Sequence, residues 1–403
     1  MTTDMDAVSG SEKNTEHGAG RPEDFRDSLV EWLADNLTPA VVTAGHAGIE
    51  NTENLAIWRT WNHRLYEGGW AAPAWPAAFG GRDASIDQQL AYLEEMARAE
   101  APGPLNVIGV SNIAPAIMAM GTDEQRARYL VPMLRGDEIW CQGMSEPDAG
   151  SDLASLRTSA VLDGDSFVVN GHKTWNSLGR HADWCQLYVR TDPRAPKHKG
   201  ISCLLVDMTT PGIEVRPLRT MTGDLTFCEL FFDEVRVPKG ALLGRIDEGW
   251  GVAMTTLSYE RAGVARLHLG LTGRFEELLA EARRVGVRPV GGVRDGLAAL
   301  YARIACMRWT TTRELEAIGR GSQPSPVMGS LAKLMWAQVE QDLADLAIDL
   351  LGPAALLGPW SKNLNAARQA SIAGGTSEIN RNIVAEHGLG LPREPRPTAG
   401  TSP

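Results

Sequence analysis

The sequence predicts an α+β protein in which an N-terminal helical domain, a central antiparallel β-barrel or sandwich, and a C-terminal helical bundle follow one another. Three observations predict this order: apolar residues recur at helical spacing in the first third, at a spacing of two in the middle, and at helical spacing again afterwards. We place the three domains at residues 23–135, 136–242 and 243–391. Polar tails at 1–22 and 392–403 flank them and are expected to be disordered.

Helical spacing in the first domain is clearest at Leu29 and Leu33, and again at Leu90 and Leu93. Residues 68–81 are rich in glycine and proline, so we expect a loop that interrupts the helices there. A further helix should begin after Thr122, because Thr122 is a good N-cap and a glutamine three residues later completes a capping box.

The middle domain contains short runs that are typical of strands, separated by turn-forming pairs such as Asn170-Gly171 and Pro211-Gly212. The predicted strands lie at 166–170, 185–189, 201–206 and 227–235. Helices are expected again at 249–285, 295–320 and 326–351, with a short last helix after residue 377.

Composition and charge exclude several classes of function. The 403 residues carry a net charge of −11, so no excess of lysine and arginine is available to neutralise nucleic-acid phosphates. The five cysteines are scattered without a C-x-x-C pair, which argues against a zinc or disulfide site. The longest uncharged run, 101–122, is interrupted by proline and asparagine. We therefore expect a soluble, cytoplasmic protein that binds neither nucleic acid, nor a membrane, nor a metal.

Three segments carry candidate chemistry. Residues 142–152 follow a strand and form a loop rich in backbone donors and hydroxyls, which can approach a planar ring or a phosphate closely; a plain polar turn is an equally good interpretation of this stretch alone. Residues 170–179 contain Trp175 and Ser177, which point to one side if the segment is a strand. Taken alone, that stretch favours a tryptophan buried in the core.

The third segment is residues 372–379, where Gly374 and Gly375 precede a helix. Free N–H groups at a helix N-terminus favour negative charge, although glycine-rich turns between helices are common.

Together the three segments resemble the acyl-CoA dehydrogenase family. The matching motifs are SEPDAGSD at 145–152, Trp-x-Ser at 175–177 and GGTSEI at 374–379, with supporting fragments at 69–81, 121–125 and 231–238. The resemblance covers residues 23–392. It implies FAD as cofactor, an acyl-CoA substrate (with an acyl carrier protein as the other possible carrier), an electron-transferring flavoprotein as acceptor, and a homodimer or homotetramer.

The resemblance also implies roles for single residues. Gln142, Met144, Ser145, Trp175 and Ser177 match positions that line the flavin. The remaining matches are Ser151 near the flavin and the CoA phosphates, Thr376 and Glu378 at the FAD phosphates or adenosine, Asp349 and Gly352 in a segment that reaches a neighbouring subunit, and Tyr259, Arg261 and Gly375 at the substrate.

The catalytic base departs from the commonest family pattern. The glutamate that many members carry before Gly-Thr is replaced here by Gly374. Glu260 instead matches the position used by isovaleryl-CoA and long-chain members. Apolar residues at −7, −3, +4, +7 and +11 put Glu260 on the apolar stripe of a helix, where desolvation should raise the pKa of its carboxyl. The alternative is a glutamate paired with an arginine in an interface.

The implied reaction is an α,β-dehydrogenation. Glu260 removes the α-proton, the backbone N–H of Gly374 donates to the thioester carbonyl, and a hydride passes from Cβ to flavin N5, which leaves a trans-2-enoyl thioester. The small residues Ala373 and Gly374 open space that suits a branched, cyclic or bulky acyl group.

Alternatives stay open for the contact to a neighbour's FAD and for the function itself. The Arg-x-x-Phe-Gly motif that reaches a neighbour's FAD is absent from 282–292, and Arg288 and Arg294 are candidates to replace it. A flavin oxidase or monooxygenase of the same fold is one alternative function. A non-catalytic subunit of a hetero-oligomer is the other.

Overall fold

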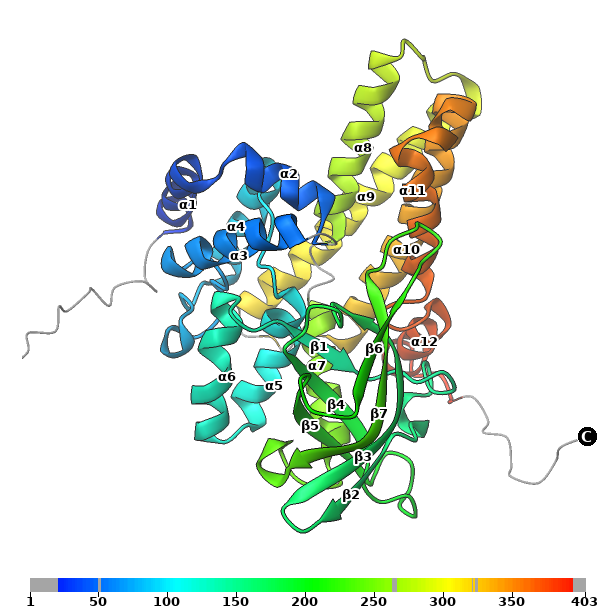
Figure 1. Ribbon diagram of the computed structural model, residues 1–403. Helices are drawn as coiled ribbons and strands as arrows, with labels where there is room; N and C mark the ends of the chain where they lie inside the picture. The colour runs from blue at the N-terminus through cyan, green and yellow to red at the C-terminus, as the bar shows by residue number, and fades with distance from the viewer. Residues whose placement is uncertain (1–20, 50–51, 263–266, 321, 323–324, 394–403) are drawn as a thin grey trace, which may run out of the picture.

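The computed structural model describes residues 21–49, 52–262, 267–320, 322 and 325–393. The N-terminal helices lie on one side of the molecule, the β-sheet lies below and between, and long C-terminal helices rise on the other side (Figure 1). This arrangement confirms the predicted succession of helical, β and helical parts.

Where the N-terminal part is described, it contains six α-helices and a tryptophan-rich loop. Their bounds are α1 (Pro22–Asn36), α2 (Pro39–Ala47), α3 (Thr52–Glu67), α4 (Ile86–Arg98), α5 (Ala114–Met120) and α6 (Asp123–Arg135). The predicted capping box is confirmed, since the Thr122 side chain accepts from the Gln125 N–H and the Gln125 side chain accepts from the Thr122 N–H. The loop between α3 and α4 buries Trp70 and Trp75, so it is a packed part of the core.

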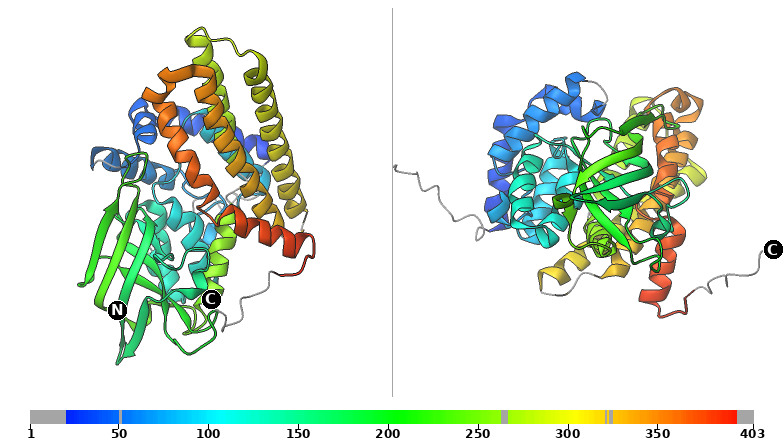
Figure 2. Two further views of the ribbon diagram at one scale, coloured as in Figure 1. Left: turned by 90° about the vertical axis from the view of Figure 1, so that its right-hand side faces the viewer. Right: turned by 60° about the horizontal axis from the view of Figure 1, so that its bottom comes forward.

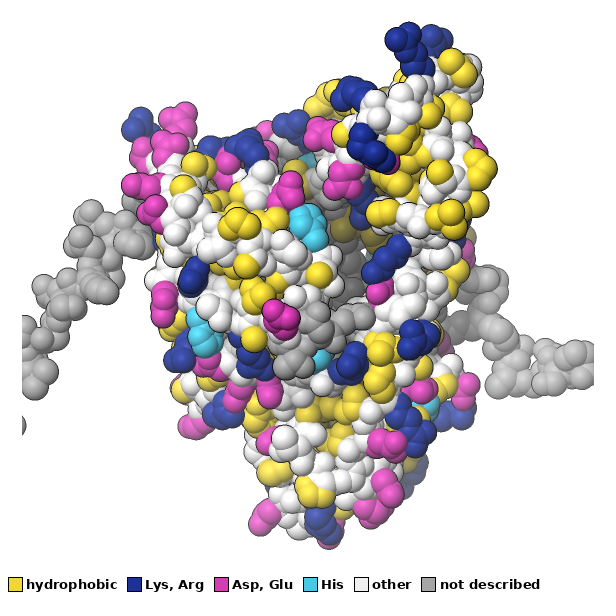
Figure 3. All heavy atoms as spheres, turned by 45° about the horizontal axis from the view of Figure 1, so that its top comes forward, with side chains coloured by type: hydrophobic (Ala, Val, Ile, Leu, Met, Phe, Trp, Pro, Cys, Tyr) yellow, Lys and Arg dark blue, Asp and Glu magenta, His cyan; other side chains and the backbone are white. Residues whose placement is uncertain are grey.

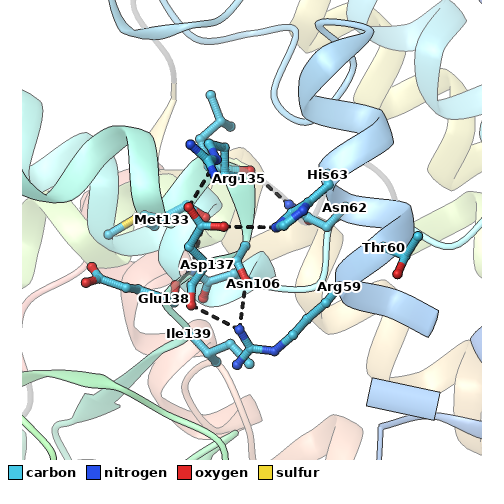
Figure 4. Close-up of polar contacts among 12 residues, drawn as sticks. Arg59, Thr60, Asn62, His63, Asn106, Met133, Arg135, Asp137, Glu138 and Ile139 are labelled. Atoms are coloured by element: carbon cyan, nitrogen blue, oxygen red, sulfur yellow. Dashed lines mark hydrogen bonds and ion pairs between the residues drawn. The ribbon is translucent and has the colours of Figure 1, made fainter. Parts of the chain in front are cut away.

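Two buried asparagines join the N-terminal helices to the first strand (Figure 4). Asn62 accepts from the Leu105 N–H at 2.9 Å and donates to the Leu134 carbonyl at 3.0 Å. Asn106 accepts from the Trp140 N–H at 2.9 Å, where the first strand begins. Because buried amides that lose such bonds are costly, these contacts fix where the strand enters the sheet.

The sheet contains the strands β1 (Trp140–Gly143), β2 (Ser159–Asp163), β3 (Ser166–Ser177), β4 (Trp184–Arg190), β5 (Ile201–Asp207), β6 (Ile213–Leu218), β7 (Phe227–Pro238) and β8 (Leu242–Leu243). Their order is β6-β7-β3-β2-β4-β5-β8, and β1 pairs with β4. Most pairs are antiparallel, but β1–β4 and β2–β4 are parallel. The β-domain expected as an antiparallel barrel or sandwich is therefore present as an open, mixed sheet. Alternation of apolar residues reports the two faces of a strand and not its partners.

The C-terminal part contains α7 (Gly249–Ala262), α8 (Leu267–Arg284), α9 (Gly291–Gly319), α10 (Pro326–Leu351), α11 (Pro359–Ala366) and α12 (Ser377–Ile383). The helix expected over 249–285 corresponds to α7 and α8, and residues 263–266 between them lie outside the described part. Helix α10 has the predicted bounds. Helices α8, α9 and α10 run side by side around a core of Leu271, Leu278 and Leu343, whereas α7 lies against the sheet (Figures 1 and 2).

Over the described residues, no helix taken singly has the length and apolar character needed to cross a membrane. One bent pair, Val327–Leu357 with Pro359–Ser371, passes by length and composition only when its halves are combined across a 117° bend.

Candidate active site

The first two sequence motifs, which lie some thirty residues apart in the chain, meet in the fold. The loop that follows β1 runs beside the end of β3, because the Thr174 N–H donates to the Ser145 carbonyl at 2.9 Å. The Asn176 side chain donates to the Gln142 carbonyl at 2.5 Å. Residues 142–146 and 173–177 therefore form one continuous surface, although the sequence presents them as two separate segments, a loop and a strand.

A buried ion pair holds this surface together. Lys173 has a fully buried side chain whose ammonium donates to the Glu146 carboxylate at 2.8 Å and to the Met144 carbonyl at 3.0 Å. Glu146 is 8% exposed and also accepts from the N–H groups of Arg157 at 2.6 Å and Thr158 at 2.8 Å. The two ends of the loop are thereby tied to one carboxylate and to β3.

The ionisation of the pair follows from these contacts. Burial alone would raise the pKa of the Glu146 carboxyl, but Lys173 and the hydrogen bonds from residues 157 and 158 outweigh burial and hold that pKa below its usual range. Burial lowers the pKa of the Lys173 ammonium, and Glu146 opposes that shift only in part. Between the lowered pKa of Glu146 and the lowered pKa of Lys173 both groups are charged, and each neutralises the other.

Trp175 is presented to solvent on the surface that the two motifs share. The pairing of β3 with β7 shifts register between Lys173 and Asn176, and Trp175 lies in this irregularity with φ 61°. Its side chain is 61% exposed and forms an edge-to-face contact with Phe227, with ring centroids 5.8 Å apart. The interpretation as a core tryptophan is therefore wrong. A large aromatic face held in a strained backbone conformation is available to a planar ligand.

The residues beside Trp175 complete this surface. Asn176 is buried and Ser177 half-buried, next to the exposed Trp175. The side-chain oxygen of Asn176 is buried, and among the described residues it has no hydrogen-bond partner. Such a group requires an unseen donor or carries a desolvation cost, so it fits a site that receives a polar ligand.

The third motif forms a tight turn in front of α12. Gly374 and Gly375 have backbone φ angles of 67° and 86°, values that residues other than glycine rarely adopt. Thr376 caps the helix by accepting from the Ile379 N–H, and the buried Asn380 amide donates to the carbonyls of Gly375 and Thr376 at 2.9 and 3.0 Å. The turn is rigidly held, while Gly374, Gly375 and Glu378 are exposed on it.

The structure describes the backbone of α7 through Ala262, but the side chains of Tyr259, Glu260 and Arg261 lie outside the described residues. Val252, Ala253 and Thr256 are buried on this helix. Position 260 continues the same face, since it lies seven residues after 253 and four after 256. The predicted apolar stripe thus agrees with the packing of the described part of α7.

Of the remaining predicted residues, Asp349 and Gly352 lie in the C-terminal bundle, and Ser151 belongs to the first motif. Asp349 is exposed near the end of α10, and Gly352, with φ 70°, opens the 3₁₀ turn η6 (Gly352–Leu357). That end of the bundle is far from the sheet in Figure 1. Ser151 is exposed on the loop after β1. Within the described residues, no three His, Cys, Asp or Glu side chains gather where they could hold a metal ion.

Sequence analysis missed several residues that build the surface: Glu146, Lys173, Asn176, Gln186 and Thr256. Gln186 offered a signal, because it is the one amide inside the apolar run 185–189. Lys173 offered none, since an exposed lysine in a strand looks the same in sequence.

Comparison with known proteins identifies the class to which this fold and site belong. Three family models match in order: the N-terminal domain of acyl-CoA dehydrogenase at 21–137, the middle domain at 141–235 and the C-terminal domain at 247–389. Acyl-CoA dehydrogenase IpdE1 of Mycobacterium tuberculosis is 37% identical over 382 residues, which cover 92% of this chain and 98% of the relative. The human mitochondrial short-chain specific acyl-CoA dehydrogenase is 31% identical over 326 residues, covering 77% of this chain and 78% of the relative.

Solved structures agree with these matches. The structure named Tcur3481-Tcur3483 steroid ACAD superposes with a TM-score of 0.82 at 32% identity, covering 93% of this chain and 98% of the other. The ChsE4-ChsE5 complex from Mycobacterium tuberculosis gives a TM-score of 0.78 at 31% identity, covering 96% and 100%. The chain therefore belongs to the acyl-CoA dehydrogenase family, whose members are in general FAD-dependent oxidoreductases. The predicted family, fold class and enzyme class are confirmed.

Proposed function

We propose that this protein uses FAD to dehydrogenate an acyl-CoA between its α and β carbons. The observation that carries the proposal is the surface on which residues 142–146 meet residues 173–177, with Trp175 61% exposed upon it. An exposed tryptophan face beside a buried, unpaired Asn176 oxygen fits a ligand that combines a planar ring with polar edges.

The residues proposed to hold the cofactor come from all three motifs. Gln142, Met144, Ser145, Trp175 and Ser177 line the flavin in this proposal. Ser151 lies toward the phosphates, and Thr376 and Glu378 contact the adenosine end, with Asp349 and Gly352 serving a neighbouring subunit. A bound FAD supplies the acceptor for the hydride that leaves Cβ of the acyl chain.

The proton chemistry is assigned to α7 and to the turn before α12. Glu260 removes the α-proton, and the Gly374 N–H donates to the thioester oxygen as negative charge develops there. Gly374 cannot act as the base because it has no side chain. Tyr259, Arg261 and Gly375 contact the substrate in this proposal. The support for Glu260 is the buried face of α7, which continues at position 260.

The proposed substrate class is a bulky, polycyclic acyl-CoA, such as one derived from a steroid. Ala373 and Gly374 are small and exposed in the turn where many family members carry larger side chains. A structural neighbour that this chain matches over 98% of the neighbour's length is named a steroid ACAD, which supports the same substrate class. The CoA carrier, rather than a carrier protein, follows the family as a whole.

We also propose that the chain works in an oligomer. Hydrophobic side chains gather on the part of the C-terminal bundle at the upper right of Figure 3, and Leu357 on η6 is 93% exposed. Two structural neighbours are named as pairs of different chains, which favours a related second chain over a homotetramer. An electron-transferring flavoprotein as acceptor and a cytoplasmic location remain proposals on the family's general pattern.

An anaerobic titration tests the function. The purified protein is loaded with FAD, alone and with a co-expressed related subunit, and titrated with straight-chain and steroid-derived acyl-CoAs. Bleaching of the flavin band by the polycyclic group, with formation of the enoyl-CoA, is the expected result. A protein that holds FAD but is bleached by no acyl-CoA in either form contradicts the proposal.

A further inference from the structure

A chain of buried polar groups links the loop after β1 to helix α7. The side chain of Gln142 donates to the Gln186 oxygen at 3.4 Å, and Gln186 donates to the Thr256 hydroxyl at 3.2 Å. The hydroxyls of Thr256 and Tyr188 share a further hydrogen bond at 3.2 Å. Gln186 and Thr256 are fully buried and Tyr188 is 1% exposed. The chain starts on the surface that carries Trp175, reaches the helix that carries Glu260 at Thr256, and returns to β4 at Tyr188.

Stability alone does not explain these residues. Each buried amide or hydroxyl must find a hydrogen-bond partner or destabilise the fold. Apolar residues of similar volume would fill the same space between β4 and α7 without that requirement. Hydrogen bonds are directional, whereas apolar contacts are not. A connected chain of hydrogen bonds therefore allows only one rotation of α7 against the sheet, and apolar packing would not impose this.

The rotation of α7 decides where position 260 points. Thr256 precedes position 260 by four residues, about one helical turn, so the two share a face. A slip of one residue would turn that face by about 100° and shift it by about 1.5 Å. Displacements of about 1 Å at a reacting group can lower a rate about a hundredfold.

We propose that Gln186, Thr256 and Tyr188 are positioning residues, which set the angle of the base-bearing helix against the loop that lines the cofactor. The inference rests on the proposed function. Because the hydrogen-bonded chain begins at Gln142, these three residues also hold the side chain that is proposed to line the flavin. A substitution at Thr256 on α7 should therefore also change FAD binding at Gln142. Burial raises the pKa of the Tyr188 phenol, so the relay stays neutral and does not titrate with the base.

The test compares Thr256→Val, which removes the hydroxyl at constant shape, with Thr256→Ser, which keeps it. Thr311→Val is the matched control, because Thr311 is also buried but its hydroxyl donates only within its own helix, to Met307 and Arg308. All variants are loaded with FAD, and the rate of flavin reduction at saturating acyl-CoA is measured with the KM.

Thr256→Val should reduce flavin at least about tenfold more slowly with KM within about twofold of wild type. Thr256→Ser and Thr311→Val should stay within about twofold in both quantities. An unchanged rate in Thr256→Val, or an equal loss in Thr311→Val, would overturn the proposal. If Thr256→Val does not fold, Tyr188→Phe is tested in its place. Its rate of flavin reduction should fall while its KM stays unchanged.

A second readout needs no turnover. The FAD dissociation constant is measured for Gln186→Leu, Thr256→Val and the double variant. Each single change should weaken FAD binding about threefold or more through Gln142, and the double variant should be no worse than the worse single, since both break one chain. Additive losses, or none, overturn the relay while leaving the proposed function intact. A wild type that binds FAD but accepts no acyl-CoA refutes the proposed function, whatever the binding cycle gives.

Discussion

Replacement of Lys173 by methionine should destabilise the protein strongly, because it strands the Glu146 carboxylate inside the fold. Methionine fills a similar volume, so the change removes the charge and leaves most of the packing. Glu146 would keep the N–H groups of Arg157 and Thr158 but lose its cation. The Met144 carbonyl would lose its donor at 3.0 Å.

The size of the effect follows from burial. Lys173 is 0% exposed and Glu146 8%, so solvent cannot replace the missing partner. Removing one member of a buried pair costs about 3–5 kcal/mol, whereas replacing both members by neutral groups is often close to neutral. We therefore expect a loss of about 3–5 kcal/mol in the free energy of unfolding for Lys173→Met at pH 7.5. The double variant Lys173→Met/Glu146→Gln should recover most of it.

The loss should depend on pH with a definite sign. In the wild type the pKa of Glu146 is lowered on folding, so its contribution is present above the unfolded pKa and is lost as the pH falls. Without Lys173, burial raises that pKa above the unfolded value, so the carboxyl destabilises the fold as the pH rises through it. Because pH 5 lies above the unfolded pKa of glutamate, about 4.3, only the second effect operates between the two pH values. It makes the gap between wild type and variant smaller at pH 5 than at pH 7.5.

Urea denaturation at the two pH values, followed by circular dichroism, measures these differences. Arg236→Met is the control, because Arg236 pairs with Asp163 on the same sheet with both side chains about 60% exposed. That exposed pair should contribute less than about 1 kcal/mol. Two results would refute the conclusion that the buried Lys173–Glu146 ion pair holds the surface together. One is a stability loss in Lys173→Met no larger than that of the control, and the other is a stability difference from wild type that widens at pH 5.

Three further predictions concern single elements. Trp175→Ala should weaken FAD binding about tenfold in a fluorescence titration and change stability by less than about 0.5 kcal/mol, since the side chain is 61% exposed; equal FAD affinity would count against the flavin surface. Thr122→Ala should lower the free energy of unfolding by about 1 kcal/mol while Thr122→Ser lowers it much less, because only alanine removes the N-cap acceptor; equal losses would show that the cap does not matter. Gly375→Ala should lose about 1–2 kcal/mol because φ is 86° and a Cβ would lie 3.2 Å from the Asn380 amide. Gly240→Ala, which meets nothing within 4 Å, should not, and thermal unfolding of both variants compares them.

Much of the fold was accessible from local sequence signals. The capping box at Thr122, the bounds of α10 and the strands at 185–189 and 201–206 follow from interactions between residues close in the chain. The parallel pairing of β1 with β4 did not follow, because it depends on residues more than forty positions apart, such as Trp140 opposite Trp184. Period-two patterns contain no information about such partners.

The site was predictable in its motifs and not in its geometry. Trp175 was a candidate from its motif, but the local pattern favoured a core position, since nothing in residues 170–179 indicates the register shift that exposes it. Lys173 and Glu146 are ordinary surface residue types, and only the fold brings them together in a buried pair. The Gln186–Thr256 contact joins a strand and a helix that are far apart in the chain. The local sequence around either residue therefore does not indicate its partner.

The central claim is that Glu260 removes the α-proton while Gly374 contributes only its backbone. The most direct test is anaerobic stopped-flow reduction of the FAD-loaded protein by an acyl-CoA that bleaches the wild type. Wild type, Glu260→Gln and the exposed control Glu248→Gln are compared. We predict that Glu260→Gln keeps its yellow colour and is reduced about a hundredfold or more slowly, while Glu248→Gln matches the wild type. Reduction of Glu260→Gln at the wild-type rate would contradict the account.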